Sequence, residues 1–286
     1  MPTIKTKLKK EKNLTVKKLG NIKFETIIEC FLKSFKNYFV EMPTDINYYK
    51  NRWGIAKVDF NLSYGMFDDE KLIGFIINAV DERNGTKIAF NTGTGVLPEY
   101  RGKRIVKTIY DYAIPDLKIN GITKCSLEVI TENFKAIKSY QSIGFKICKT
   151  FECYSGDINL KINEKVELNK ENYSKFDWSN LPNQDLYSWD FHSKTIKGGD
   201  YNYYQIIKDN LPESYFVINP KNGYLAQFEV LEKDKGNWNR LFNGIKKISE
   251  TIKVINIDKR LSEKIEFINS IGLSNTVNQY EMEIEL

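Results

Sequence analysis

The chain has 286 residues, of which 41% are hydrophobic and 28% charged, a composition typical of globular proteins and a length that suggests two domains. No apolar run approaches the roughly 20 residues that span a bilayer, and the lysine-rich start lacks the apolar segment of a secretion signal. We therefore expect a cytoplasmic protein without a membrane anchor. The net charge of +6 comes mainly from residues 1–18, which hold seven lysines and one glutamate. This favours a solvated basic tail at residues 1–13 over a nucleic-acid-binding arm.

The first half alternates strand and helix patterns in chain order. Strands are expected at 14–19, at 63–80 as a hairpin turning at 68–70, and at 86–97, 125–130 and 145–155. Helices are expected at 21–36, 45–53, 103–120 and 133–142. Pro115 should kink or end the third helix, because it removes one helical hydrogen bond. Since helices separate the last three strands, part of the sheet should be parallel and covered on both faces.

The second half repeats part of this order in two registers. Ser214-Tyr215 matches Ser63-Tyr64 of the hairpin at an offset of 151, whereas Ser270-Ile-Gly-Leu matches Ser142-Ile-Gly-Phe at an offset of 128. The fall in offset predicts that the second copy lacks the strand that corresponds to 86–97 and the turn after it. Chance similarity between two α/β segments is the alternative. Aromatic residues crowd the start of this half and are expected to be mostly core rather than the wall of a pocket: Trp178, Tyr187, Trp189, Phe191, Tyr201, Tyr203 and Tyr204.

Cysteine and histidine are too sparse and too scattered to suggest a metal site. The four cysteines (Cys30, Cys125, Cys148 and Cys153) form no CxxC pair, and the single histidine, His192, has no partner at ligand spacing. We expect four reduced thiols and no bound metal.

The stretch GTGVLPEYRGKRIVKTIYDYA, from Gly93 to Ala113, passes from a strand through Arg101-Gly102 into a helix. A helix start presents unpaired N–H groups and the positive end of its dipole, so this turn can bind an anion such as phosphate. Gly93 and Gly95 indicate a bulge or a close approach to the strand backbone. An extended ligand that carries both amides and a pyrophosphate, such as the pantetheine arm of coenzyme A, fits both features. A plain strand-to-helix connection is the alternative.

Downstream, Asn133, Ala136 and Tyr140 lie on one helix face ahead of Gly144-Phe145. With the Arg-Gly turn, they make residues 14–154 resemble the GNAT superfamily of N-acetyltransferases, whose motifs are (Gln/Arg)-x-x-Gly-x-(Gly/Ala) and Asn-x-x-Ala-x-x-x-Tyr-x-x-x-Gly-Phe. Two positions depart from the pattern: Arg104 replaces a glycine, and Val106 replaces the final Gly/Ala. Arg104 is tolerable if its φ is negative; its side chain either reaches a phosphate or faces solvent, and Val106 is expected to pack inward.

The resemblance implies a GNAT fold, an α/β mixed and mostly antiparallel sheet flanked by helices, followed by a smaller degenerate copy. It also implies acetyl-CoA as co-substrate, with the following cofactor-binding residues: Val96, Leu97, Arg101, Gly102, Lys103, Arg104, Ile105, Val106, Asn133 and Ala136. Tyr140 becomes the candidate general acid for the leaving thiolate, with a core aromatic as the alternative. Asn133 would hold the pantetheine, and the N–H of Leu97 or Val96 would bind the oxyanion.

The general base is less well defined, because residues 88–96 contain no carboxylate. Glu128 lies between the apolar residues Leu127 and Val129 and should face opposite to them, which makes it the candidate base. Asp81, Glu82 or a water chain are alternatives.

These observations predict an acetyl-CoA-dependent N-acetyltransferase domain at residues 1–155 and a degenerate copy without a coenzyme A site at 156–286. The acceptor is an amine of a small molecule or peptide whose identity stays open, as does assembly into a homo-oligomer. The main alternative is a non-catalytic acyl-CoA-binding or structural module. A nucleic-acid-binding protein is disfavoured, because no recognisable module accompanies the lysines.

Overall fold

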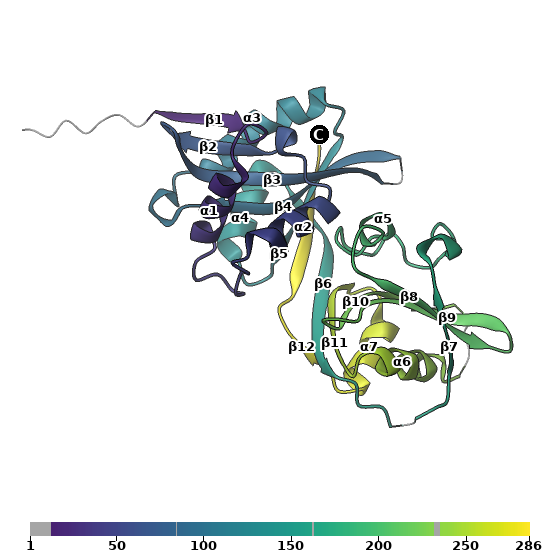
Figure 1. Ribbon diagram of the computed structural model, residues 1–286. Coiled ribbons are helices and arrows are strands. Elements are labelled where there is room, and N and C mark those ends of the chain that lie inside the picture. Colours follow the sequence, from purple (N-terminus) through teal and green to yellow (C-terminus); the bar gives the residue numbers. More distant parts are fainter. Residues whose placement is uncertain (1–12, 84, 162, 232–234) are drawn as a thin grey trace, which may run out of the picture. The chain divides into compact units, whose positions relative to one another are not determined.

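The computed structural model describes residues 13–83, 85–161, 163–231 and 235–286, so most of the basic tail lies outside the described residues (Figure 1). Contacts divide the chain into two compact units. Unit 1 is Met1–Gly54, Val58–Cys125 and Glu285–Leu286, and unit 2 is Ile55–Lys57 and Ser126–Ile284. Among the described residues, no helix combines the length and the apolarity needed to cross a membrane.

Unit 1 is built on four antiparallel strands that lie side by side in chain order (Figure 1). They are β1 (Leu14–Lys18), β2 (Tyr64–Asp68), β3 (Lys71–Arg83) and β4 (Thr86–Val96). The helices are α1 (Phe24–Ser34), α2 (Ile46–Ile55) and α3 (Ile105–Ile119). These elements confirm the expected order. Pro115 lies inside α3, and the helix continues to Ile119.

Adjacent residues of β3 show how helices cover both faces of this sheet. Phe75 is fully buried and stacks on Phe31 of α1, with ring centroids 5.7 Å apart. Its neighbour Gly74 points to the opposite face, where a Cβ atom would approach Ile105 of α3 to 2.8 Å. The alternation of the strand therefore places α1 and α3 on opposite sides.

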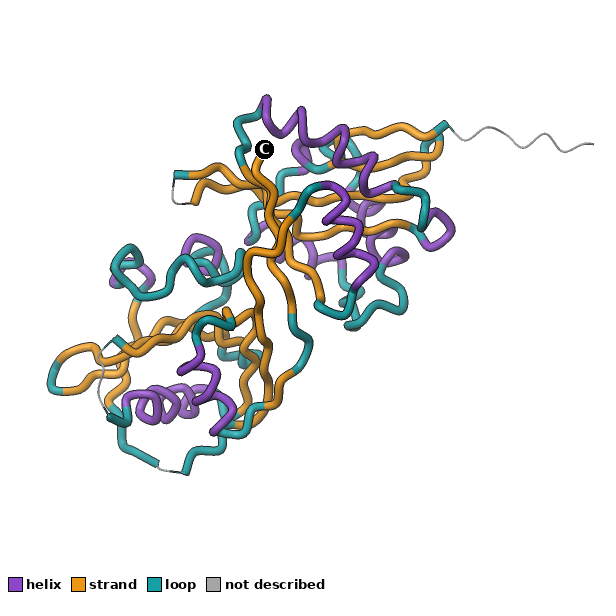
Figure 2. The backbone as a smooth tube through the Cα atoms, turned by 180° about the vertical axis from the view of Figure 1, so that it is seen from behind, coloured by secondary structure: helices purple, strands orange, loops and turns teal. Residues whose placement is uncertain are grey.

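Unit 2 also has strands as its scaffold (Figure 2). Their order in the sheet is β5 (Lys124–Ile130, which begins in unit 1), β13 (Gln279–Glu285), β6 (Lys146–Asp157), β11 (Thr251–Asp258), β10 (Tyr224–Val230), β9 (Leu211–Asn219), β8 (Asn202–Lys208) and β7 (Glu167–Glu171). The short β12 (Ser274–Asn275) pairs with β6. The helices are α4 (Phe134–Ile143), α5 (Ser193–Ile196), α6 (Asn237–Ile248) and α7 (Ser262–Ser270). The predicted boundary after Ser155 falls within β6, whereas the contacts divide the chain at Cys125.

The prediction that the second half lacks a fourth strand is wrong. Four antiparallel strands, β7 to β10, precede α6, and β11 then runs parallel to β10. Ser214-Tyr215 therefore lies in the third strand of this set, β9, whereas Ser63-Tyr64 leads into the second strand of unit 1. The offset of 151 matched strands that do not correspond.

The offset of 128, in contrast, agrees with the elements that follow. It carries Phe134, the first residue of α4, onto Ser262, the first residue of α7. It also pairs their N-cap residues, Asn133 and Leu261. The second half thus repeats strands, helices and their order more completely than its sequence indicates.

Aromatic side chains form much of the core of unit 2, as predicted. Phe191 and Tyr203 belong to one buried cluster, and Tyr204 belongs to a second. Trp178, Tyr187 and Tyr201 pack against the first cluster, and Trp189 is buried.

Candidate active site

The C-terminal part of β4 contains a bulge. The pairing of β3 with β4 shifts between Ile77 opposite Gly93 and Asn78 opposite Asn91, which leaves Thr92 as the extra residue. The buried Asn91 supports this bulge: its Oδ1 accepts the N–H of Gly93 at 3.0 Å, and its Nδ2 donates to the hydroxyl of Tyr110 at 2.7 Å. The bulge expected near Gly93 is confirmed, and its extra residue is Thr92.

Gly95 is required by packing within unit 1. A Cβ atom there would lie 2.5 Å from the ring of Phe75 and 2.7 Å from Cβ of Ser34. A close approach to the strand backbone was predicted at its glycines. At Gly95 the approaching groups are the side chains of Phe75 and Ser34.

The turn between β4 and α3 is fixed by Arg101. Its guanidinium donates to the carbonyl of Val96 at 3.2 Å and to the carbonyl of Ser34 at 2.7 Å. Gly102 follows with φ +77°, a left-handed conformation that suits glycine. The side chain of Arg101 thus joins the end of β4 to the end of α1.

Arg104 is the N-cap residue of α3 and also has a left-handed backbone, with φ +56° and ψ +23°. The condition of a negative φ, under which a residue other than glycine would be tolerable here, is therefore not met. The turn keeps the shape that a glycine would take, because the chain must still bend into α3 there. Arg104 itself is exposed.

The start of α3 supplies the N–H groups that the sequence predicted for an anion. The first N–H groups of any helix lack acceptors within it, and they lie here at Ile105, Val106 and Lys107. Ile105 is buried and Val106 is half-buried. Lys103 binds the carbonyl of Glu99 at 3.0 Å.

The two candidate oxyanion donors differ. The N–H of Leu97 donates to the carbonyl of Ile73 at 2.9 Å, so it is committed to the backbone of β3. Val96, the last residue of β4, is the candidate that remains.

In unit 2, the second family motif lies on α4. Asn133 caps the helix, because its Oδ1 accepts the N–H of Ala136 at 3.2 Å. Tyr140 lies two turns later and is 8% exposed, with its ring edge-on to Phe145 at 5.8 Å. Gly144 ends the helix with φ +117°.

Glu128, the candidate base, is half-buried on β5 and hydrogen-bonded by a residue that the sequence reading did not single out. Nδ2 of Asn256 on β11 donates to Oε2 of Glu128 at 2.7 Å. The offset of 128 already placed Asn256 on Glu128 and could have identified it. The alternative base Asp81 lies 3.7 Å from the buried Nε of Arg83 on the same strand.

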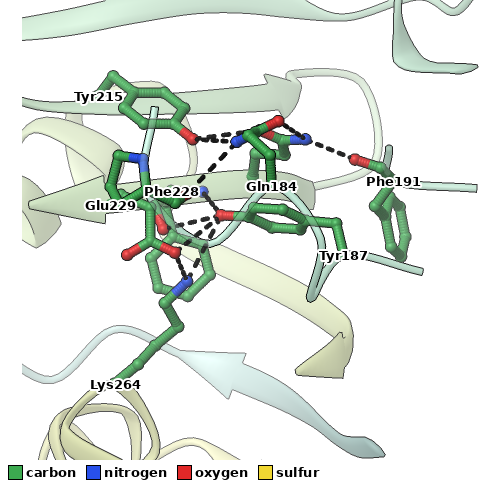
Figure 3. Close-up of polar contacts among 9 residues, drawn as sticks. Gln184, Tyr187, Phe191, Tyr215, Phe228, Glu229 and Lys264 are labelled. Atoms are coloured by element: carbon green, nitrogen blue, oxygen red, sulfur yellow. Dashed lines mark hydrogen bonds and ion pairs between the residues drawn. The ribbon is translucent and has the colours of Figure 1, made fainter. Parts of the chain in front are cut away.

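A second polar cluster lies deep in unit 2, around β10 (Figure 3). Nζ of Lys264 binds Oε1 of Glu229, and both side chains are almost fully buried. The hydroxyl of Tyr187 accepts the N–H of Phe228 at 3.3 Å and lies within 3.2 Å of both the carbonyl of Phe228 and Oε1 of Glu229. Burial lowers the pKa of Lys264, against the opposing effect of Glu229.

The side-chain amide of Gln227, also on β10, belongs to the same cluster. Gln227 donates to the carbonyl of Phe191 at 2.7 Å and accepts from Tyr215 at 3.1 Å. β10 pairs with β11 at Tyr224, and farther along the strand the backbone of Phe228 bonds to Tyr187. Among the described residues, the side chains of Gln227 and Tyr187 are thus hydrogen-bonded to other groups of unit 2.

One set of possible metal ligands occurs among the described residues: Cys148 on β6 with Glu281 and Glu283 on β13. Burial raises the pKa of the Cys148 thiol, which donates to the carbonyl of Glu281 at 3.4 Å. Burial also raises the pKa of the Glu281 carboxyl. Both shifts favour the protonated forms, whereas a metal needs deprotonated ligands. All four cysteines are free thiols.

Comparison with known proteins agrees with this geometry. The model of the acetyltransferase (GNAT) family matches residues 24–145. This part of the chain is therefore similar to the GNAT family, as the two motifs indicated. No curated protein sequence matches the chain.

Solved structures with the same fold cover nearly the whole chain. A tandem GNAT protein from the clavulanic acid biosynthesis pathway has a TM-score of 0.66 at 10% identity, over 95% of this chain and 98% of its own. A putative acetyltransferase from Pyrococcus horikoshii has a TM-score of 0.63 at 12% identity, over 96% and 89%. A probable N-acyltransferase from Enterococcus faecalis V583 has a TM-score of 0.59 at 15% identity, over 95% and 72%. The chain therefore has the GNAT fold in a two-domain architecture.

Proposed function

We propose that this protein transfers the acetyl group of acetyl-CoA to a primary amine. The observation that carries the proposal is the agreement of two family motifs with local structure: the left-handed turn that leads into α3, and the helix α4 with Asn133 and Tyr140. The match of the GNAT family model to residues 24–145 supports the same reaction class.

The turn from Arg101 to Val106 would bind the pyrophosphate of coenzyme A. Its N–H groups and the dipole of α3 favour an anion, and the exposed cation of Arg104 adds positive charge. Arg101 shapes this turn through its two backbone contacts. Asn133 and Ala136 would contact the pantetheine arm, and Val96 would donate its N–H to the oxyanion.

In the reaction, the nitrogen of a neutral amine attacks the thioester carbon, the C–N bond forms and the C–S bond breaks. Glu128 takes a proton from the attacking nitrogen, and Tyr140 gives one to the leaving sulfur. Solvent returns the proton from Glu128 to Tyr140, so that the products are an amide and the free thiol of coenzyme A.

The proposal is tested by assaying release of the coenzyme A thiol with a panel of amines, comparing wild type with Tyr140→Phe. We expect the variant to lower kcat by about 10²–10⁴-fold while acetyl-CoA binding changes little, because the hydroxyl acts on a species present only near the transition state. Tyr112→Phe removes the hydroxyl of an exposed tyrosine and should leave kcat unchanged. Wild-type turnover by Tyr140→Phe would exclude Tyr140 as the acid.

A non-catalytic acyl-CoA-binding module is the second candidate. The observation that favours it is the commitment of two expected site groups to the fold, since Asn133 caps α4 and the Leu97 N–H binds Ile73. Calorimetry with acetyl-CoA separates the two candidates, because binding without turnover of any amine supports the second.

A further inference from the structure

Glu128 is held by the residue that occupies its own position in the second repeat. The offset of 128 that relates α4 to α7 also relates Glu128 on β5 to Asn256 on β11. Nδ2 of Asn256 donates to Oε2 of Glu128 at 2.7 Å. The carboxylate in the first repeat therefore receives an amide donor from the second.

Neighbouring contacts fix the orientation of the Asn256 amide. Its Oδ1 accepts from Nε2 of Gln279 at 2.9 Å and from the thiol of Cys153 at 3.5 Å. Burial raises the pKa of Cys153 to about 11, so this thiol keeps its proton at neutral pH. With the oxygen engaged by two donors, the NH₂ group must face Glu128.

The backbone at Asn256 is shaped for this contact. The pairing of β11 with β6 shifts between Val254 and Ile257, so Asn256 lies in a bulge opposite Cys153. Its φ is +60°, in the left-handed region that asparagine adopts more readily than most residues other than glycine. A bulge redirects a side chain out of the alternation of its strand, and such bulges concentrate next to active sites. Asn256 is buried, so solvent does not compete for its amide.

We infer that Asn256 is a positioning residue for the general base: it holds the carboxylate of Glu128 in one orientation to receive the proton of the acceptor amine. This inference rests on the proposed acetyl transfer. A hydrogen bond from an amide that is itself fixed restricts the rotation of the carboxylate and so sets the direction in which it receives a proton. The second repeat thereby takes part in the chemistry of the first without contributing a catalytic residue.

A double-mutant cycle with Glu128→Gln and Asn256→Gly tests the inference. Glycine adopts φ +60° without strain, so Asn256→Gly removes the amide and leaves the bulge. We expect Asn256→Gly to lower kcat by about 10–100-fold, the size expected for losing a hydrogen bond to a carboxylate, with KM for acetyl-CoA nearly unchanged. In the Glu128→Gln background, Asn256→Gly should have no further effect on kcat, because it acts through Glu128.

Asn278→Ala is the matched control, because Asn278 immediately precedes β13 and its side chain accepts the backbone N–H of Cys153 at 3.2 Å. It should leave kcat unchanged. Urea unfolding of all variants shows whether each remains folded at the assay temperature.

Three results would overturn the inference. Equal loss of kcat from Asn256→Gly in both backgrounds would show that Asn256 acts elsewhere, and unchanged kcat in Glu128→Gln would show that Glu128 is not the base. Both results leave the proposed function standing. Wild-type protein that acetylates no amine would overturn the proposed function as well.

Discussion

Arg104 carries a backbone conformation that its side chain does not favour. The left-handed region costs a residue with a Cβ about 1–2 kcal/mol, and a cation at a helix N-terminus is also unfavourable by a few tenths of a kcal/mol. The GNAT motif that this segment resembles has glycine at this position, and the turn has a left-handed backbone with φ +56°. The backbone strain therefore arises because arginine has a Cβ atom, and a glycine in the same turn would not be strained.

Arg104→Gly is expected to raise the free energy of unfolding by roughly 0.5–1 kcal/mol, since the gain from relieved strain exceeds the added freedom of glycine in the unfolded chain. Urea denaturation measures the difference. Arg104→Ala is the matched control, because it removes the same charge but keeps the Cβ, and it should gain less. Equal stabilisation by both variants would mean that charge rather than backbone strain limits stability.

Single residues also show what sequence reasoning can and cannot supply. Tyr140 and the Arg-Gly turn could be found because they lie in fixed spacings along one segment. The donor to Glu128 could not be found in this way, because a bulge on a strand far along the chain aims Asn256 at it. The left-handed φ of Arg104 could have been anticipated, because the motif has a glycine at this position.

Strand β10 has backbone groups that are hydrogen-bonded by a side chain and not by a neighbouring strand. The N–H and C=O of Phe228 both lie within hydrogen-bonding distance of the Tyr187 hydroxyl, which also contacts Glu229 (Figure 3). Burial raises the pKa of Tyr187 well above its usual value, so the hydroxyl stays neutral. It is both donor and acceptor for the strand.

Tyr187→Phe should lower the free energy of unfolding by about 1–3 kcal/mol, because it leaves buried backbone groups of β10 without their partner. Thermal or urea unfolding of the whole chain, followed by tryptophan fluorescence, provides the measurement. Tyr204→Phe serves as the comparison: its hydroxyl accepts a longer bond of 3.4 Å from Asn202, and its removal should cost less. Similar losses in the two variants would argue against a role for Tyr187 at this edge.

At the level of elements, the first half of the chain was predictable because its strands and helices have clear periods and separate turns. The second half was not, because β7 is short and polar and β8 follows a long aromatic segment without regular alternation. The turn between β8 and β9 did carry evidence: Asp209 and Asn210 both have positive φ, as in a two-residue hairpin. Reading that turn would have restored the missing strand.

Among the described residues, a set of four antiparallel strands followed by helix, strand, helix and strand occurs twice, but the residues proposed to bind coenzyme A occur in the first series alone. At the offset of 128, Leu261 and Ile268 of the second copy replace Asn133 and Tyr140. Glu229 lies on the strand before α6, where it is buried and paired with Lys264, so it offers no contact to a phosphate. Glu232 and Asp234, two further carboxylates in the segment before α6, lie outside the described residues. Among the described residues of β10, the Phe228 backbone is already bonded to Tyr187.

We therefore expect one coenzyme A per chain, bound through the turn that precedes α3. The N-cap positions of α3 and α6 offer a matched pair of variants, because Arg104 and Gly236 both have left-handed backbones. Arg104→Glu places a negative charge beside the proposed phosphate site and should weaken binding at least tenfold, since charged pairs near a protein surface interact by several kcal/mol at contact. Gly236→Glu makes the corresponding change in the second copy and should alter neither affinity nor stoichiometry. Isothermal titration with coenzyme A measures both quantities. A second equivalent in the wild-type protein that Gly236→Glu removes would show that the second copy has kept a coenzyme A site, despite the loss of its asparagine and tyrosine.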